Sequence, residues 1–175
     1  MSESRDPGAP APVPAGAWFT ARRRVEFRDT DAAGIVHFSS YFVWMEAAEH
    51  DFLRAAGVRL VEPLPAGSVA SAPEVVSWPR VSATCDYLSA VTFDDEVEIR
   101  VGVEAIGRTS VTYAFRFECQ GRAVARGRVV AVRCRMRHGA PPQSVEITPE
   151  IRGRLEPYIV AVGEDRQSAR RRPGP

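Results

Sequence analysis

The clearest helical pattern in the chain lies between residues 39 and 57. Apolar residues recur there at intervals of three and four, which places them on one broad face of a helix. Ser39 or Ser40 is a candidate N-cap, and Gly57 stands where a C′ glycine belongs. The pattern therefore predicts one long amphipathic helix. The expected apolar face consists of Tyr41, Met45, Ala48, Phe52 and Ala56, widened by Phe42, Trp44 and Leu53.

Three later segments alternate apolar and polar residues with a period of two, as strands with one apolar face do. Turn signals at 107–108 and 120–121 separate them, which predicts an antiparallel meander. Gly127 indicates a bulge in the third segment. Further strands are expected over 17–27 and within 74–91. The expected inward residues are Val97, Ile99, Val101 and Val103; Val111, Tyr113, Phe115 and Phe117; and Val130, Val132, Cys134 and Met136.

The order of elements is a strand, a helix and then four or five antiparallel strands. One broad-faced helix against one antiparallel sheet is an α+β layer architecture, in which the sheet can wrap the helix. Residues 1–16 are rich in Pro, Gly and Ala, and residues 161–175 are polar and basic. Neither segment can bury enough apolar surface to offset its ordering entropy. We therefore expect a single domain over 17–160 between two disordered tails.

Charge and composition narrow the function classes. The 175 residues carry a formal net charge of +1 and are 45% hydrophobic, which indicates a soluble domain without a nucleic-acid partner held by bulk charge. No apolar run is long enough to span a bilayer, and the N-terminus lacks the basic and apolar regions of a secretory signal. All 23 basic residues are arginine, which excludes a catalytic lysine.

Cysteines and histidines give no metal or disulfide pattern. Cys85, Cys119 and Cys134 are widely spaced and odd in number, so we interpret them as free thiols in a reducing compartment, the cytoplasm. The three histidines show no metal-ligand spacing. We therefore expect no metal site and no cofactor.

The segment RDTDAAGIVHFSSY, residues 28–41, carries the candidate chemistry. Asp29 and Asp31 alternate in an extended segment, so one is expected to be structural and the other reactive. Gly34 allows close approach to a backbone or ligand. The amides of 38–41 belong to a helix start and can hold a negative oxygen. A carboxylate beside them supplies a nucleophile or base and an oxyanion hole; a turn or a capping carboxylate is the alternative.

The stretch RVEFRDTDAAGIVHFSSYFVWMEAAEHDFLRAAG resembles the first strand, motif loop and central helix of the hot-dog-fold acyl-CoA thioesterases, in particular the 4-hydroxybenzoyl-CoA thioesterase-like family. The family pattern D-x-D-x-x-G-x-V with a Tyr at the helix start is met by Asp29, Asp31, Gly34, Val36 and Tyr41. The later segment CDYLSAVTFDDEVEIRV is also similar to the family. The resemblance implies a long central helix wrapped by a curved, five- to six-stranded antiparallel sheet. It also implies a homodimer paired edge to edge, or a tetramer made of two such dimers.

The resemblance further implies hydrolysis of an acyl-CoA to a carboxylic acid and CoA, with no cofactor. Asp31 corresponds to the catalytic carboxylate, which acts as nucleophile or general base. The Phe38 amide corresponds to the oxyanion donor, and Arg108, at a hairpin tip, corresponds to basic positions that meet the CoA phosphates. The oxyanion and substrate-pocket residues expected in this chain are Gly34, Val36, His37, Phe38, Tyr41 and Glu46.

Other readings stay open. Tol–Pal-associated relatives have Tyr-His where this chain has His37-Phe38, so the histidine is displaced by one residue. A hot-dog dehydratase acting on hydroxyacyl thioesters would use a His paired with a carboxylate, here His37 near Asp31. Another thioesterase group uses a helix glutamate, for which Glu46 and Glu49 are the candidates. A non-catalytic acyl-thioester-binding protein on the same fold is a further alternative.

Overall fold

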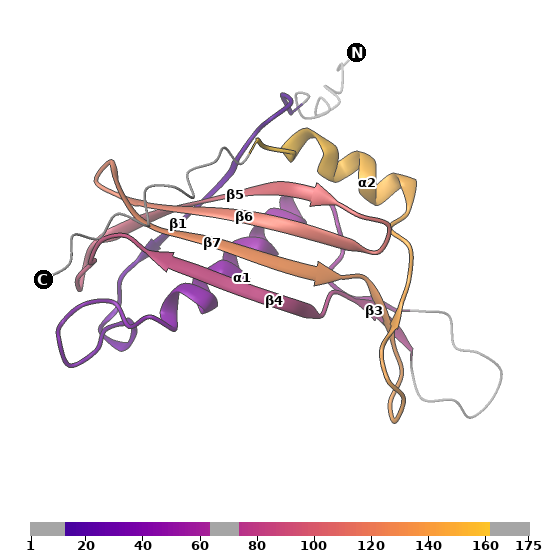
Figure 1. Ribbon diagram of the computed structural model, residues 1–175, viewed down its shortest axis with the longest axis horizontal. Helices are drawn as coiled ribbons and strands as arrows, with labels where there is room; N and C mark the ends of the chain where they lie inside the picture. Colours follow the sequence, from indigo (N-terminus) through magenta and orange to yellow (C-terminus); the bar gives the residue numbers. More distant parts are fainter. Residues whose placement is uncertain (1–12, 64–73, 162–175) are drawn as a thin grey trace, which may run out of the picture.

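The computed structural model describes residues 13–63 and 74–161 (Figure 1). The predicted tails lie outside these residues apart from 13–16 and 161, so the domain limits stay a prediction. In chain order the elements are β1 (Phe19–Arg24), η1 (Phe27–Asp29), α1 (Ser40–Ala55), β2 (Glu62–Pro63), β3 (Val75–Ser77), β4 (Arg80–Tyr87), β5 (Glu96–Ile106), β6 (Ser110–Cys119), β7 (Arg122–Val132), β8 (Cys134–Met136), β9 (Gln143–Ser144), α2 (Pro149–Leu155) and η2 (Glu156–Tyr158).

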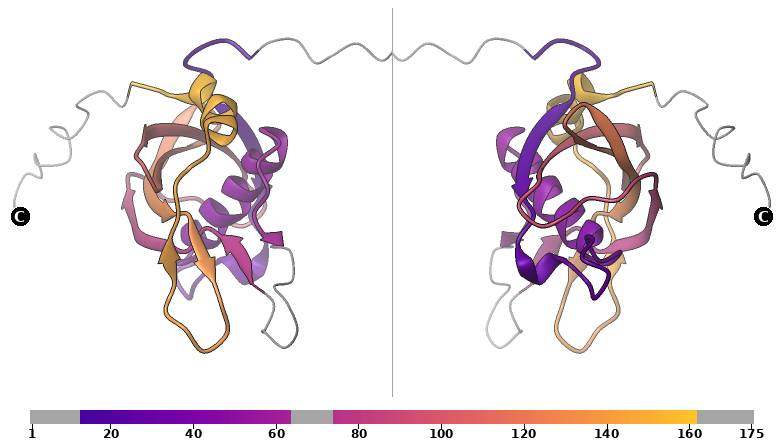
Figure 2. Two further views of the ribbon diagram at one scale, coloured as in Figure 1. Left: turned by 90° about the vertical axis from the view of Figure 1, so that its right-hand side faces the viewer. Right: turned by 90° about the vertical axis from the view of Figure 1, so that its left-hand side faces the viewer.

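One large sheet and one long helix form the body of the molecule. The five-stranded sheet has the order β1-β5-β6-β7-β4, and every neighbouring pair in it is antiparallel. The strands curve around α1, as Figure 2 shows from both ends of the molecule. This is the predicted α+β arrangement of a hot-dog fold. A second, four-stranded sheet of order β2-β3-β8-β9 extends beside it and was not predicted.

Helix α1 confirms the predicted amphipathic helix. Its apolar face is buried against the sheet, with Ala48, Phe52 and Leu53 fully enclosed. Gly57 has a positive φ of 70°, and the amides of Gly57 and Val58 bond to the carbonyls of Arg54 and Leu53 at 3.0 and 2.8 Å. These two bonds make a Schellman motif, which is why glycine is required there.

Strands β5 and β6 carry the predicted alternation, and all eight of their expected inward residues are buried. Strand β7 does not. Val129 and Ala131 point into the core, whereas Val130 and Val132 are only half-buried. Small residues face the helix because space is short there: a Cβ atom on Gly127 would collide with Met45 Sδ. The prediction chose the larger residues as inward, and for β7 it was wrong.

The predicted bulge at Gly127 was also wrong. Gly127 pairs in regular register with Phe115 and Cys85. The irregularity lies at Val124 instead, since Phe117 pairs with Ala125 and Glu118 with Ala123. The close approach of Met45, and not a bulge, is what requires a glycine at position 127.

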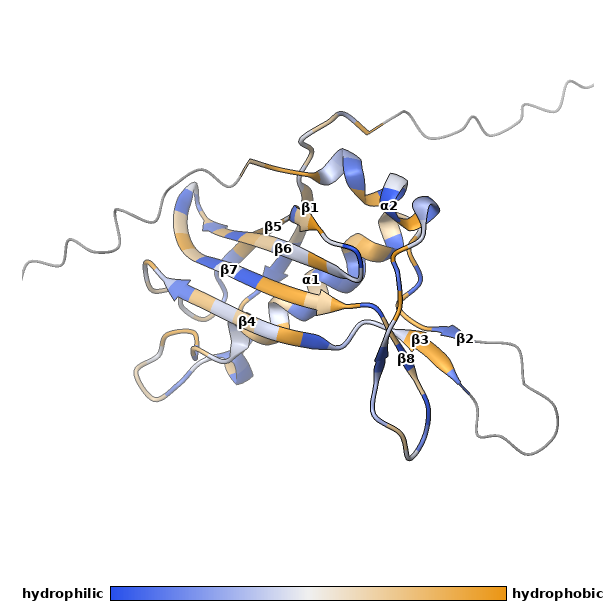
Figure 3. Cartoon of the chain, turned by 45° about the vertical axis from the view of Figure 1, so that its right-hand side comes forward, coloured by the Kyte–Doolittle hydropathy of each residue, from blue (hydrophilic) through white to orange (hydrophobic). Residues whose placement is uncertain are grey.

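The segment 130–136 was expected to be one strand but is divided at Arg133. Strand β7 ends at Val132, and β8 begins at Cys134 in the second sheet. The buried Arg133 guanidinium bonds to Glu62 Oε2 at 2.8 Å and to the Glu146 carbonyl at 2.7 Å. A side chain with these partners holds the corner between the sheets. Figure 3 shows the apolar end of β7 leading to this corner.

Two ends of the chain differ from the expected pattern. The first strand is shorter than 17–27, because Phe27 lies exposed in η1. At the other end, α2 was not predicted. Thr148 caps it by accepting the Ile151 amide at 3.3 Å, and Ile151 and Leu155 are buried. No helix in the described part of the chain is long and apolar enough to cross a membrane.

Candidate active site

The loop between η1 and α1 is tied down on both sides. Thr30 and Val36 form a bridge across the loop, and Ile35 forms another with Thr92. The Val36 amide donates to the Val91 carbonyl at 2.8 Å. The loop therefore has a fixed position at the start of α1, at the left of Figure 1.

Asp29 is the structural member of the aspartate pair. Its Oδ2 accepts the Glu26 amide at 2.9 Å, which closes the capping box of η1. Its carbonyl accepts the His37 amide at 2.8 Å and the Ser40 hydroxyl at 3.0 Å. Asp29 thus joins η1 to the start of α1 through its side chain and its backbone.

Asp31 faces solvent at the tip of the same loop. Its Oδ1 accepts the Ala33 amide at 2.8 Å, and its own amide donates to the Ile35 carbonyl at 2.9 Å. Gly34 has a φ of 76°, and nothing lies within 4 Å of the place a Cβ would occupy. The turn therefore needs glycine for its left-handed conformation. The close approach of another backbone segment, which was one reason to expect glycine here, does not occur within the described part of the chain.

The backbone amide of Phe38 stands out among its neighbours. The His37, Ser39 and Ser40 amides all have acceptors: the Asp29 carbonyl, His37 Nδ1 and the His37 carbonyl. No hydrogen bond to the Phe38 amide occurs within residues 13–63 and 74–161. Because it lies just before α1, the helix dipole favours a negative charge beside it. Tyr87 fixes this residue from the other side, with its hydroxyl 3.1 Å from the Phe38 carbonyl.

His37 is oriented by Ser39. Its Nδ1 lies 2.7 Å from Ser39 Oγ and accepts the Ser39 amide at 3.3 Å, so the proton belongs on Nε2. The imidazole lies beside the Phe38 ring, with 4.3 Å between ring centroids. The histidine–carboxylate pair of the dehydratase reading does not form in the described residues.

Val36 and Tyr41, both expected in the pocket, are buried beneath the loop. The Tyr41 ring packs edge-on against Tyr87 and Phe117 with centroids 5.3 and 5.4 Å apart. Burial raises the pKa of Tyr41 to about 12. These residues therefore support the loop and the helix start from below.

The two helix glutamates have different surroundings. Glu46 is more than half exposed and pairs with Arg80 at 3.2 Å. Glu49 is 0% exposed; its Oε2 accepts Arg80 at 3.2 Å, and its Oε1 has no partner in the described residues. Burial raises the pKa of Glu49 to about 7, although Arg80 acts to lower it. Glu49 is thus enclosed and cannot meet a substrate as an exposed nucleophile.

The sequence analysis predicted neither the ion pair of Arg80 with Glu49 nor the burial of Glu49. A signal was available, since Glu49 lies one turn after Met45 on the apolar face of the helix. A carboxylate on such a face needs a charged partner. The identity of that partner depends on strand pairing and cannot be read from local spacing.

Arg108 lies away from the loop. It follows β5 at the far end of this 11-residue strand, is exposed, and pairs with Glu146 at 2.9 Å. The Asp31 loop bonds to residues just before β5 begins. An 11-residue strand spans roughly 35 Å, so Arg108 and Asp31 of one chain do not come together. The described residues contain no cluster of His, Cys, Asp or Glu suited to a metal ion.

A long helix wrapped by a curved antiparallel sheet is the arrangement of a hot-dog fold. The family model of the thioesterase-like superfamily matches residues 25–155. The chain belongs to this superfamily, as the motif in the loop predicted.

Relatives of known sequence agree with this assignment. A 1,4-dihydroxy-2-naphthoyl-CoA hydrolase of Synechococcus sp. strain CC9311 is 29% identical over 145 residues, which are 80% of this chain and 95% of that protein. Its counterpart in Prochlorococcus marinus strain MIT 9303 is 27% identical over 132 residues, covering 74% and 87%. Among solved structures, a gentisyl-coenzyme A thioesterase aligns with a TM-score of 0.61 and 28% identity, covering 78% of this chain and 99% of that one.

Proposed function

We propose that this protein hydrolyses an acyl-CoA thioester to a carboxylic acid and CoA. The observation that carries the proposal is that one short loop before α1 holds both an exposed carboxylate, Asp31, and the amide of Phe38, which has no hydrogen bond in the described part of the chain. The similar proteins described above are CoA hydrolases and a CoA thioesterase, which supports the same reaction.

In this mechanism the thioester carbonyl oxygen accepts a hydrogen bond from the Phe38 amide. The Asp31 carboxylate then attacks the carbonyl carbon and expels the CoA thiolate, and water hydrolyses the resulting anhydride. Alternatively, Asp31 removes a proton from the attacking water. Both routes consume one water molecule and place the negative oxygen of the tetrahedral intermediate at the helix start.

The decisive experiment measures thiol release by the wild type and Asp31→Asn. The panel is acetyl-, hexanoyl-, palmitoyl-, benzoyl- and 4-hydroxybenzoyl-CoA. We expect the variant to lose at least about a hundredfold in rate, the contribution typical of such a group. Full activity in the variant would show that Asp31 is not the catalytic carboxylate. Binding of CoA esters without hydrolysis by the wild type would indicate a binding protein.

We further propose that the active unit is a homodimer formed through β4. This strand is an edge of the large sheet in the described residues, and nearly all of its residues are exposed, Val81 and Tyr87 among them. Open strand edges of this kind pair with other chains. Light scattering is expected to give a multiple of 19.2 kDa, twice for a dimer and four times for a tetramer. A single-chain mass would contradict this.

Two smaller proposals follow. Arg108 can contact CoA only in the site of another copy, since its own loop is distant. Loss of CoA affinity in Arg108→Ala, measured in the oligomer by calorimetry, is the result expected from this proposal.

The second proposal is a cytoplasmic location. It is supported by the three cysteines, which are all free thiols: Cys85, Cys119 and Cys134.

A further inference from the structure

The two peptide groups on either side of the Phe38 Cα atom are held by different parts of the molecule. The first carries the Phe38 amide, and its carbonyl, that of His37, accepts the Ser40 amide at 3.0 Å. The second carries the Ser39 amide, which donates to His37 Nδ1 at 3.3 Å. It also carries the Phe38 carbonyl, which accepts the Tyr87 hydroxyl at 3.1 Å. The bonds to His37 shape the turn itself, whereas the bond from Tyr87 ties the turn to strand β4 of the large sheet.

The Phe38 side chain gives its own backbone little support. Its ring is 60% exposed and lies beside the His37 imidazole, with 4.3 Å between ring centroids. An exposed ring is not locked by close packing as a core side chain is, so hydrogen bonds have to hold the backbone in place. A residue turns only about its two soft backbone dihedrals. Release of the second peptide group therefore also loosens the first, which shares the Phe38 Cα atom and carries the amide.

Tyr87 is fixed by the strand and by the core beneath it. It pairs with Ala125 of β7, and its ring packs edge-on against Tyr41 with centroids 5.3 Å apart. Tyr41 is 3% exposed and packs in turn against Phe117 of β6. Partial burial raises the pKa of Tyr87 above its ordinary value, so the hydroxyl keeps its proton at neutral pH and can donate it in a hydrogen bond. The Phe38 carbonyl is thus held by a side chain that rests on the core.

We propose that Tyr87 is a positioning residue of the reaction, an inference that rests on the proposed hydrolysis at Asp31. Tyr87 holds the Phe38 backbone so that the amide points at the place where the thioester carbonyl oxygen becomes negative. A hydrogen bond weakens steeply as its angle falls below about 120°, so a loosened amide loses much of its effect. A preorganised donor acts chiefly on the transition state, in which the charge develops. Tyr87 acts through Phe38 and does not itself touch the reacting atoms.

The structural and the positioning contributions of Tyr87 belong to different atoms. Its ring supports Tyr41 at the helix start, whereas its hydroxyl bonds to the Phe38 carbonyl. Tyr87→Phe therefore keeps the ring contact and removes the hydrogen bond alone. Tyr113→Phe is the matched control, because the Tyr113 hydroxyl is buried without a partner in the described residues. Both variants lose one hydroxyl group, but only the first loses a bond to the loop.

The kinetic test measures kcat and KM of the wild type and of both variants on the best ester of the panel. In Tyr87→Phe we expect kcat to fall about three- to tenfold, the effect of one neutral hydrogen bond, and KM to change by less than about twofold. Tyr113→Phe should keep the wild-type kcat. Thermal unfolding shows whether each variant is folded. An unchanged kcat in Tyr87→Phe, or an equal fall of kcat in Tyr113→Phe, would overturn the inference.

Binding separates failure of this inference from failure of the proposed hydrolysis. Calorimetry compares two compounds that cannot be hydrolysed: the ketone analogue of hexanoyl-CoA, in which a CH₂ group replaces the sulfur, and the thioether S-hexyl-CoA, which has no carbonyl. The wild type should bind the ketone at least about threefold more tightly than the thioether. Tyr87→Phe should lose this preference and bind the thioether as the wild type does.

That result supports the inference even if no ester is cleaved. Three results would overturn it, whatever the activity of Asp31: a wild type without the preference, a preference that persists in Tyr87→Phe, or an equal loss of affinity for both compounds in that variant. The last of these would show that the Tyr87 hydroxyl merely supports the loop as a whole.

Discussion

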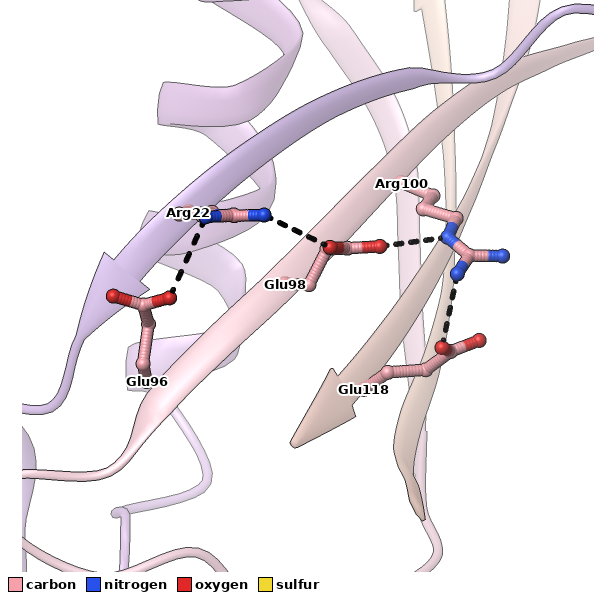
Figure 4. A network of polar contacts seen from close by, with 5 residues as sticks. All are labelled: Arg22, Glu96, Glu98, Arg100 and Glu118. Atoms are coloured by element: carbon pink, nitrogen blue, oxygen red, sulfur yellow. Dashed lines mark hydrogen bonds and ion pairs between the residues drawn. The ribbon is translucent and has the colours of Figure 1, made fainter. Parts of the chain in front are cut away.

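Two arginine–glutamate clusters lie on opposite faces of the large sheet. On the outer face, Arg100 pairs with Glu98 at 3.0 Å and with Glu118 at 3.1 Å, and the network continues through Glu98 to Arg22 (Figure 4). On the helix side, Arg80 pairs with Glu46 and Glu49 at 3.2 Å. The distances are alike, yet Glu98 and Glu118 keep about a third of their surface exposed and Glu49 keeps none.

Burial, and not the number of ion pairs, separates the two clusters. Exposed pairs are screened by water and contribute on the order of 0 to 1 kcal/mol each. A buried carboxylate loses its hydration, so the loss of its partner leaves an uncompensated group in the core. The outer cluster is therefore replaceable, whereas the inner one constrains both α1 and the edge strand β4.

The largest contrast is expected when the central arginine of each cluster is removed. Arg80→Met should lower the free energy of unfolding by about 1 to 3 kcal/mol, because the buried carboxyl of Glu49 then loses its hydrogen-bond partner. Arg100→Met should lower it by less than about 1 kcal/mol. Urea unfolding followed by circular dichroism measures both. Equal losses in the two variants would show that burial of Glu49 does not distinguish the clusters.

The pH dependence of stability sharpens the same contrast. The pKa of Glu49 is raised from 4.5 to about 7 by burial. Between these values the folded chain holds a proton that the unfolded chain has released, so the free energy of unfolding falls as pH rises from about 4.5 to about 7. The expected loss is about 2 to 3 kcal/mol.

Glu49→Gln should remove this part of the pH dependence, as seen in urea unfolding at pH 5 and pH 8. Glu118→Gln on the outer face is the control and should keep the wild-type slope. If the free energy of unfolding changed by the same amount between pH 5 and pH 8 in the wild type and in Glu49→Gln, the raised pKa of Glu49 would be contradicted.

Substitution of a glycine that packs against the helix is expected to change the free energy of unfolding by a smaller amount. A methyl group on Gly127 would collide with Met45 Sδ and crowd Phe115 Cβ at 3.3 Å. Gly127→Ala should therefore lower the free energy of unfolding by about 2 kcal/mol. Gly153→Ala in α2, where nothing lies within 4 Å of the new atom, should raise it by about 0.5 to 1 kcal/mol. Thermal unfolding of both variants checks the sign of each change.

Periodicity predicted the fold where side chains of clearly different size alternate. In β5 and β6 large apolar residues alternate mostly with charged or small ones, and the inward face was correct. In β7 the inward residues include Gly127 and Ala131, which a hydrophobicity pattern ranks below Val130. The strands of the second sheet are two or three residues long, too short to show a period.

The local arrangement of the loop was predictable because its residues are close in sequence. The different environments of Asp29 and Asp31 follow from a motif of a few residues and their alternation. The role of Arg80 was not predictable, because its direction depends on a bulge at Val81 and its partners lie about 30 residues away on α1. Glu49 lies on a predicted apolar face, yet only tertiary packing shows that it is fully enclosed.

The central claim, that thioester hydrolysis takes place at Asp31 beside the Phe38 amide, is tested most directly by kcat for Asp31→Asn and Asp29→Asn on the best ester of the panel. Asparagine at position 29 can still accept the Glu26 amide, so that variant should keep most of its activity. Asp31→Asn should lose at least about a hundredfold in kcat while unfolding at the wild-type temperature. An active Asp31→Asn beside an inactive, folded Asp29→Asn would contradict the account.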